Sequence, residues 1–137
     1  MNKVASLPTV LAALTLLCAL AGAAAAQDEA PRITIQELKS LIDKGADVLV
    51  ADAQPKAVYE KGHIKGAVSF PWKAKIRAED AARLPHGKLI VTYCDCGPGE
   101  SDSAAVAAQL LALGFEDVKV LADPSIRGWK AAGYPME

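Results

Sequence analysis

The residues of this chain best suited to chemistry are two cysteines one residue apart, Cys94 and Cys96. An apolar, β-branched run, residues 89–93, precedes them and predicts a buried strand that ends at Cys94. A loop with glycine and proline follows, and an alanine- and leucine-rich stretch, residues 101–113, predicts a helix. This order places a thiol at the end of a strand, among loop N–H groups and the positive end of a helix dipole. Because those groups stabilise a thiolate, we predict that Cys94 is a reactive cysteine.

Cys96 is interpreted as a resolving or redox partner. It would react with an oxidised form of Cys94, such as a sulfenate, and close a Cys94–Cys96 disulfide. Two other roles stay open, because the loop is long enough for Cys96 to be the nucleophile itself or a bystander. A disulfide between cysteines so close in sequence closes too small a loop to stabilise the fold much. The pair is therefore predicted to serve a function rather than the stability of the fold.

A metal site is a weaker interpretation of the same residues. A Cys-x-Cys pair can bind a soft ion such as Cu(I). A closed zinc site needs four ligands, whereas there is no third thiol beside the pair, and His63 and His86 are not at ligand spacing. We therefore expect neither a metal nor a cofactor.

The first residues are typical of a secretory signal peptide. Lys3 supplies a positive n-region, residues 10–20 are almost wholly apolar, and residues 23–26 offer an Ala-x-Ala cleavage site before Gln27. The apolar run is shorter than the roughly 20 residues that a membrane-spanning helix needs. We predict a signal peptide over residues 1–26, a periplasmic or secreted mature protein, and no membrane attachment after cleavage.

Cleavage would leave residues 27–137, which suffice for one small domain with a single core. Cys18 would leave with the signal peptide, so the mature chain would keep only Cys94 and Cys96. The full chain has a formal net charge of −1, with charged residues mixed along the sequence and no basic block. We therefore expect no nucleic-acid partner, and we expect a monomer.

Strand and helix patterns alternate along the mature chain. Strands are predicted at residues 48–51, 89–93 and 118–121, with a brief one that ends at Pro71, and helices at residues 35–42, 76–84, 101–113 and 125–132, with a short one near Tyr59. Thr34 and Glu37 fit a capping box, whereas residues 27–32 are polar and predicted to be frayed. This alternation predicts an α/β fold with a parallel sheet and helices on both faces.

Four segments resemble those of a known family, in its order and with its spacing. They are VLVADAQPKAVYEKGHIKGAVSFP (residues 48–71), LIVTYC with its glycine loop (89–99), AAQLLALGFEDVKVL (107–121) and GWKAAGYP (128–135). Each is modest evidence alone, but together they are specific and cover nearly all of the mature chain. The chain is similar to the single-domain rhodanese-like (sulfurtransferase) family, of an exported bacterial type.

The resemblance implies a rhodanese-like three-layer α/β/α fold with a central parallel sheet of about five strands. It also implies a sulfurtransferase in which Cys94 carries sulfane sulfur as a persulfide. The donor would be a small sulfur-containing molecule or a protein persulfide, and the acceptor a thiol. Backbone N–H groups of a substrate-binding loop would wrap the sulfur. The residues of that loop are Asp95, Cys96, Gly97, Pro98, Gly99, Glu100 and Ser101.

The departures from the family pattern lie in this loop. The usual CxxGxRS has an arginine that helps to hold an anionic donor, whereas CDCGPGESDS is longer, has no arginine and contains Asp95, Glu100 and Asp102. Negative charge disfavours both a thiolate and an anionic donor, so we expect weak thiosulfate turnover. A rhodanese-fold phosphatase or arsenate reductase would need the arginine to clamp an oxyanion. The remaining alternative is a catalytically weak module that acts as a periplasmic binding or thiol-redox partner.

Overall fold

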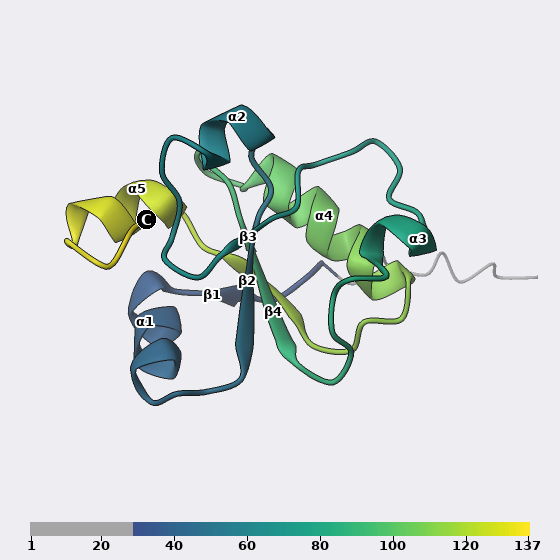
Figure 1. Cartoon of the computed structure of the whole chain (residues 1–137), viewed down its shortest axis with the longest axis horizontal. Helices are drawn as coiled ribbons and strands as arrows, with labels where there is room; N and C mark the ends of the chain where they lie inside the picture. The colour runs from purple at the N-terminus through teal and green to yellow at the C-terminus, as the bar shows by residue number, and fades with distance from the viewer. Residues whose placement is uncertain (1–28) are drawn as a thin grey trace, which may run out of the picture.

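The structure is a computed structural model that describes residues 29–137 (Figure 1). The predicted signal peptide, residues 1–26, lies outside the described residues. In chain order, the elements are β1 Arg32–Ile33, α1 Ile35–Asp43, β2 Val48–Asp52, α2 Lys56–Tyr59, β3 Val68–Ser69, α3 Ala78–Ala81, β4 Leu89–Tyr93, α4 Ser101–Ala112, β5 Val118–Leu121 and α5 Ser125–Ala131. None of the helices in this part of the chain is long and apolar enough to cross a bilayer.

The five strands form one parallel sheet in the order β1-β5-β4-β2-β3. The predicted α/β fold with a parallel sheet of about five strands is therefore confirmed. The strand that ends at Cys94, β4, is central and pairs with β2 on one side and β5 on the other. Because the strands are parallel, the loops that follow them meet at one edge of the sheet, as the carboxyl ends of strands do in open α/β folds.

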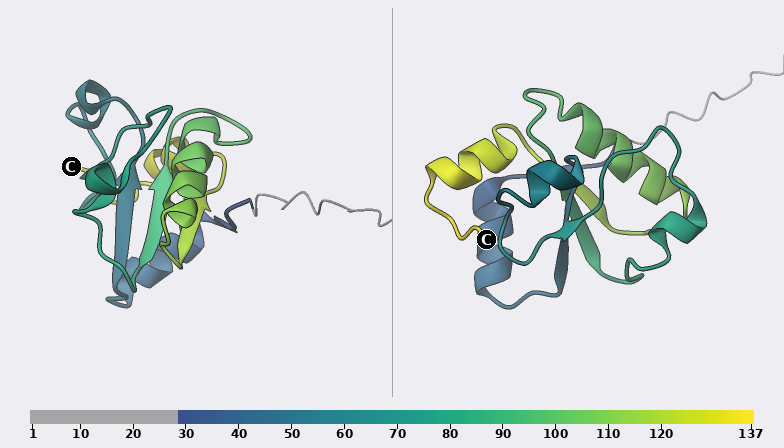
Figure 2. Two further views of the ribbon diagram at one scale, coloured as in Figure 1. Left: turned by 90° about the vertical axis from the view of Figure 1, so that its right-hand side faces the viewer. Right: turned by 45° about the horizontal axis from the view of Figure 1, so that its top comes forward.

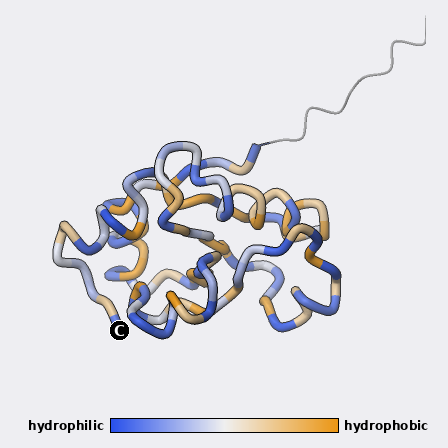
Figure 3. The backbone as a smooth tube through the Cα atoms, turned by 90° about the horizontal axis from the view of Figure 1, so that it is seen from above, coloured by the Kyte–Doolittle hydropathy of each residue, from blue (hydrophilic) through white to orange (hydrophobic). Residues whose placement is uncertain are grey.

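Helices cover both faces of the sheet, which gives the three layers (Figures 1 and 2). On one face, Leu38 of α1 and Trp129 of α5 belong to one buried cluster. On the other, Ala81 of α3 and Val106 of α4 belong to a second. Figure 3 shows apolar and polar segments interspersed along the backbone. The most deeply buried apolar side chains include Ile90 and Val91 of β4 and Val106 of α4. The packing of these two clusters holds the loops at the carboxyl edge in place.

Side chains alternate between the two clusters along β4. Val91 and Tyr93 lie in the cluster with α1 and α5. Ile90 and Cys94 lie in the cluster with α4. The position of Cys94 one residue after the strand therefore directs its side chain toward the first turn of α4.

The segment predicted to be frayed, residues 27–32, is ordered in its last residues. Ala30 is buried, and Arg32–Ile33 form β1, which pairs with β5 at Val120 and Leu121. The prediction was wrong there because the strand is only two residues long, too short to show a period. Pairing with β5, rather than local apolar pattern, orders this segment.

The helix predicted over residues 76–84 is shorter in the structure and spans Ala78–Ala81. The N–H of Ile76 donates to Gln109 Oε1 of α4 at 2.6 Å, and Arg77 is extended. Asp80 Oδ2 accepts the Arg77 N–H at 3.0 Å and so fixes the start of the helix. A contact with α4 therefore overrides the helical pattern of the preceding residues.

The capping box predicted at the start of α1 is confirmed. Thr34 Oγ1 accepts the Glu37 N–H at 3.1 Å, and Glu37 Oε2 accepts the Thr34 N–H at 2.8 Å. The second of these bonds lowers the pKa of the Glu37 carboxyl. The box orients the chain as it leaves β1, so that α1 can pack against α5.

Candidate active site at the end of strand β4

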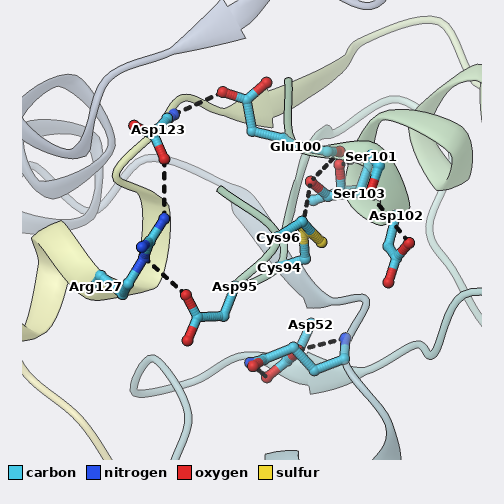
Figure 4. Close-up of a disulfide and its surroundings, with 12 residues drawn as sticks. Asp52, Cys94, Asp95, Cys96, Glu100, Ser101, Asp102, Ser103, Asp123 and Arg127 are labelled. Carbon is cyan, nitrogen blue, oxygen red and sulfur yellow. Dashed lines mark hydrogen bonds and ion pairs between the residues drawn. A yellow bond between two sulfur atoms is a disulfide. The ribbon is translucent and has the colours of Figure 1, made fainter. Parts of the chain in front are cut away.

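Cys94 and Cys96 form a disulfide at the end of β4 (Figure 4). Their Cα atoms are 5.5 Å apart. Cys94 is only 1% exposed and belongs to the cluster between β4 and α4, whereas Cys96 is exposed. The structure joins the two cysteines singled out in the sequence, and the role of Cys96 as a redox partner stays a prediction. The two sulfur atoms therefore occupy different environments, one inside the fold and one at its surface.

The first turn of α4 touches the buried sulfur. Ser103 Oγ lies 3.3 Å from Cys94 Sγ and also donates to the carbonyl oxygen of Glu100 at 3.2 Å. The Thr92 hydroxyl donates to the Ser103 carbonyl oxygen at 2.9 Å, which ties this turn to β4. Thr92 and Cys94 are two residues apart and so face the same side, where both meet Ser103.

The N-terminus of α4 presents unused donors at this place. The N–H of Ala104 makes the first bond of the helix, to Glu100 O at 2.8 Å. The N–H groups of residues 101–103 precede that bond, and within residues 29–137 none of them donates to an acceptor. Unpaired amides and the positive end of the helix dipole are what stabilise an anion at a helix N-terminus. A thiolate formed at Cys94 would therefore lie beside favourable dipoles.

Three residues of the loop have positive φ. They are Gly97 (79°), Gly99 (89°) and Glu100 (45°), and the Glu100 N–H closes the turn on Gly97 O at 3.1 Å. Glycine adopts this left-handed conformation freely, but a residue with a Cβ atom pays about 1–2 kcal/mol. The Gly-Pro-Gly sequence therefore makes the tight loop possible, and Glu100 must be held by other contacts.

Those contacts come from the Glu100 carboxylate, which is buried although the residue is charged. Glu100 is 6% exposed. Its Oε1 accepts the Asp123 N–H at 2.7 Å, and its Oε2 lies 3.3 Å from both Nε and Nη2 of Arg32. A charged side chain with these partners links the cysteine loop to β1 and to the turn after β5. Figure 4 shows the second of these links, from Glu100 to Asp123. Glu100 thus serves as an anchor of the loop and not as a solvent-facing acid.

An arginine does reach the loop, although the loop sequence has none. Arg127 Nε of α5 lies 2.8 Å from Asp95 Oδ1, and its Nη2 lies 3.1 Å from Asp123 Oδ1 (Figure 4). A Cβ atom at Gly97 would lie 3.6 Å from the same Nη2, so the arginine covers this part of the loop. Sequence reasoning missed this residue. The spacing of Asp123 and Arg127 indicates a helical i, i+4 pair, but no sequence signal connects either to Asp95.

A buried polar pair forms the floor of the site. Tyr93 donates its hydroxyl to Asp52 Oδ2 at 2.6 Å and accepts the Ile64 N–H at 3.1 Å. Asp52 also accepts two bonds from Gln54. Burial, then the bond to Asp52, raises the pKa of Tyr93 far above its ordinary value. These residues join β2, β4 and the turn before β3, so they hold the cysteine loop from below and carry no reacting group.

The structure thus brings most of the predicted loop together around the disulfide. The exposed loop residues are Asp95, Cys96, Pro98, Gly99 and Ser101, with Gly97 half-buried and Glu100 buried. Asp102 is half-buried and accepts a long bond from Ser101 at 3.4 Å. Within residues 29–137, no group of three or more His, Cys, Asp or Glu side chains is placed to hold a metal ion.

Comparison with known proteins gives a family and several structural relatives. The family model of the rhodanese-like domain matches residues 34–132. A Bacillus halodurans protein of known structure is 31% identical, with 79% of this chain and 77% of that chain aligned and a TM-score of 0.69. The rhodanese-like domain of an Anabaena protein, solved by NMR, is 30% identical over 78% of each chain, with a TM-score of 0.62.

A larger sulfurtransferase also shares the fold of this chain. The thiosulfate sulfurtransferase of Pseudomonas aeruginosa has the same fold at a TM-score of 0.59 and 24% identity. The alignment covers 79% of this chain but only 20% of that enzyme. No curated protein sequence matches this chain. The family match nevertheless spans α1 to α5 and includes the cysteine loop, so the chain belongs to the rhodanese-like family.

Proposed function

We propose that this protein is a rhodanese-like sulfurtransferase of the cell envelope, a persulfide carrier in which Cys94 holds the sulfane sulfur. The observation that carries the proposal is the position of Cys94 Sγ, 3.3 Å from Ser103 Oγ at the N-terminus of α4, whose first amides are unpaired within the described residues. Such donors lower the pKa of a thiol and stabilise a terminal persulfide anion. The location in the envelope rests on the predicted signal peptide alone.

The transfer needs no outside oxidant. The Cys94 thiolate attacks the sulfane sulfur of a donor, the bond from that sulfur to the donor breaks, and the donor leaves as its thiolate. An acceptor thiolate then attacks the outer sulfur of the Cys94 persulfide, and Cys94 returns as a thiolate. Each step makes one sulfur–sulfur bond and breaks one, as in thiol–disulfide exchange.

The disulfide is a natural by-product of this cycle. If no acceptor arrives, the Cys96 thiolate attacks the inner sulfur of the Cys94 persulfide. The Cys94–Cys96 disulfide forms and hydrosulfide leaves, so electrons balance without a further oxidant. The oxidised pair holds no thiolate, and the protein must be reduced before it can accept sulfur again.

The charges around the loop favour a neutral or protein-bound persulfide donor over thiosulfate. The two arginines at the loop are each engaged by two carboxylates, Arg32 by Glu29 and Glu100, and Arg127 by Asp95 and Asp123. Neither is a free cation for an anionic donor. We expect thiosulfate:cyanide turnover well below that of a rhodanese with the CxxGxRS loop.

The proposal is tested by sulfur transfer from a small persulfide to an acceptor thiol, with the protein first reduced. We expect turnover by the wild type and none by Cys94→Ser. Without added reductant, Cys96→Ser should continue to turn over for longer than the wild type, because it cannot form the disulfide. Ser40→Ala, on α1 and outside the cysteine loop, is the matched control. A wild-type rate no faster than the reaction without protein, or full turnover by Cys94→Ser, would contradict the proposal.

A second candidate function is supported by the disulfide itself. A catalytically weak module could act as a thiol-redox partner, using the Cys94/Cys96 pair to pass electrons without carrying sulfur. The same assay separates the two functions. A redox partner would exchange its disulfide with thiols yet give no sulfur transfer in the reduced state.

A further inference from the structure

We propose that external thiols enter this site at Cys96, and that Cys94 is the sulfur released. The proposal assigns opposite roles to the two sulfur atoms of the disulfide. It deepens the proposed function and rests on it, because the Cys94 thiolate set free is the group that accepts sulfane sulfur. Cys96 thereby becomes the substrate-contacting residue of a second reaction, thiol–disulfide exchange.

The difference in burial carries the first part of the argument. A thiolate attacks a disulfide in line with the sulfur–sulfur bond, from the side opposite the leaving sulfur, so access to each sulfur decides which is attacked. Behind Cys94 lies the cluster between β4 and α4, in which Cys94 is 1% exposed and packs with residues such as Val106. Cys96 is exposed on the loop. Attack on Cys94 would need the core to open, whereas attack on Cys96 needs no movement of the fold.

The leaving group carries the second part. Thiol–disulfide exchange is faster when the sulfur that leaves forms the more stable thiolate. Cys94 Sγ has Ser103 Oγ at 3.3 Å and the unpaired first amides of α4 close by, whereas no hydrogen bond to Cys96 Sγ is present among the described residues. Charge that develops on Cys94 during exchange is therefore stabilised from the start. Access and leaving-group stability therefore both favour attack on Cys96 and release of Cys94.

The reaction is balanced without a further reactant. A thiolate R–S⁻ forms a bond to Cys96 Sγ, the Cys94–Cys96 bond breaks, and Cys94 leaves as the thiolate. The incoming thiol is oxidised to a mixed disulfide with Cys96, and Cys94 is reduced. A second thiolate then attacks the mixed disulfide and frees Cys96.

The charges around the loop indicate which thiols react best. Asp95, Glu100 and Asp102 lie on the loop or at the start of α4. The arginines that contact Glu100 and Asp95 also bind a second carboxylate each, Glu29 and Asp123. The surroundings therefore carry more negative than positive charge. A cationic thiol is attracted and an anionic thiol repelled, and salt weakens both effects. The substrate class is accordingly neutral or cationic thiols.

The first test traps the mixed disulfide on the wild-type protein. The oxidised protein reacts briefly with cysteamine, acid stops the exchange, N-ethylmaleimide blocks free thiols, and fragmentation mass spectrometry locates both groups. We expect cysteamine on Cys96 and maleimide on Cys94. Cysteamine on Cys94 would overturn the proposal.

The second test gives a rate even if the mixed disulfide is too short-lived to trap. Cys94→Ser and Cys96→Ser are each converted to the cysteamine mixed disulfide, and the initial replacement of the bound cysteamine by isotope-labelled cysteamine is timed by intact mass, because only attack on the protein sulfur leaves the label on the protein. We expect Cys96 to exchange at least about tenfold faster than Cys94 in the folded proteins, because only Cys96 is accessible. In denaturant the two rates should become equal. Equal rates in the folded proteins, or a faster Cys94, would refute the inference.

The choice of thiol gives an independent readout. Rates are corrected for the thiolate fraction of each reagent. We expect cysteamine to react about fivefold faster than thioglycolate at low salt, with the ratio falling toward one in high salt. A ratio that favours thioglycolate would contradict the assigned substrate class.

Failure of this inference can be distinguished from failure of the proposed function. Sulfur uptake is measured separately, on the reduced protein with a small persulfide. Exchange at Cys96 without sulfur uptake would refute the carrier and leave the exchange direction standing. Sulfur uptake together with exchange at Cys94 would refute the exchange direction and leave the carrier standing.

Discussion

Ser103 is the side chain that most directly tunes the buried sulfur. Its hydroxyl lies 3.3 Å from Cys94 Sγ, and in the disulfide form its one proton goes to the Glu100 carbonyl oxygen. In the reduced protein, rotation of the hydroxyl turns that proton to the Cys94 thiolate. A hydrogen bond to a charged group contributes about 1.5–3 kcal/mol, and one pKa unit corresponds to about 1.4 kcal/mol. We therefore predict that Ser103→Ala raises the pKa of the Cys94 thiol by about one unit in the reduced protein. Thiolate absorbance during a pH titration, in a Cys96→Ser background, measures it. An unchanged pKa would show that Ser103 plays no part in stabilising the thiolate.

Tyr93 makes the stability of the protein depend on alkaline pH. Its raised pKa, caused by burial and then by the Asp52 carboxylate, means that the folded state keeps a proton that the unfolded state loses above about pH 10. The stabilisation is complete below that pH and declines above it, by about 1.4 kcal/mol per pH unit. We predict a steeper alkaline loss of unfolding free energy in the wild type than in Tyr93→Phe. The free energy of unfolding is measured by denaturant titration at each pH. Plots of this free energy against pH that run parallel for the two proteins would contradict the prediction.

At the scale of elements, Glu100 connects the loop to β1 and to the turn before α5. Glu100→Ala removes the bonds to the Asp123 N–H and to Arg32, both in a largely buried place. We predict a loss of about 1–3 kcal/mol of unfolding free energy, with a smaller loss for Glu100→Gln, which keeps an acceptor for the amide. Glu116→Ala, at an exposed position, is the control and should change little. Equal losses for Ala and Gln would mean that the acceptor kept by Gln contributes nothing, which would contradict the role assigned to the bond from the Asp123 N–H.

How far the elements could be predicted depended on their length and on their partners. The strand before Cys94 and the helix after it are long enough to show their patterns, so the position of Cys94 at their junction could be predicted. β1 has two residues and exists because β5 pairs with it. The shortened α3 and the approach of Arg127 to Asp95 arise from contacts between segments far apart in the sequence. No local pattern encodes such contacts, and the burial of Glu100 was missed for the same reason.

At the scale of the whole molecule, the proposed location can be tested without any assay of activity. If residues 1–26 direct export, full-length protein expressed in a Gram-negative bacterium should be recovered from the periplasm with Gln27 as its first residue. Replacing the apolar residues at 10–20 by polar ones should keep the protein in the cytoplasm with its leader attached. Cell fractionation and the intact mass of the product measure both. An uncleaved wild-type chain in the cytoplasm would contradict the envelope location.

The most direct test of the sulfur-carrier proposal is the intact mass of the reduced protein after exposure to a small persulfide, with excess donor removed before measurement. We predict that the wild type gains the mass of one sulfur atom and loses it when an acceptor thiol is added. Cys96→Ser should show the same gain, and Cys94→Ser should show none. Fragmentation should place the added sulfur on Cys94. No gain on either cysteine of the fully reduced, folded protein would contradict the account, and so would a gain that Cys94→Ser retains.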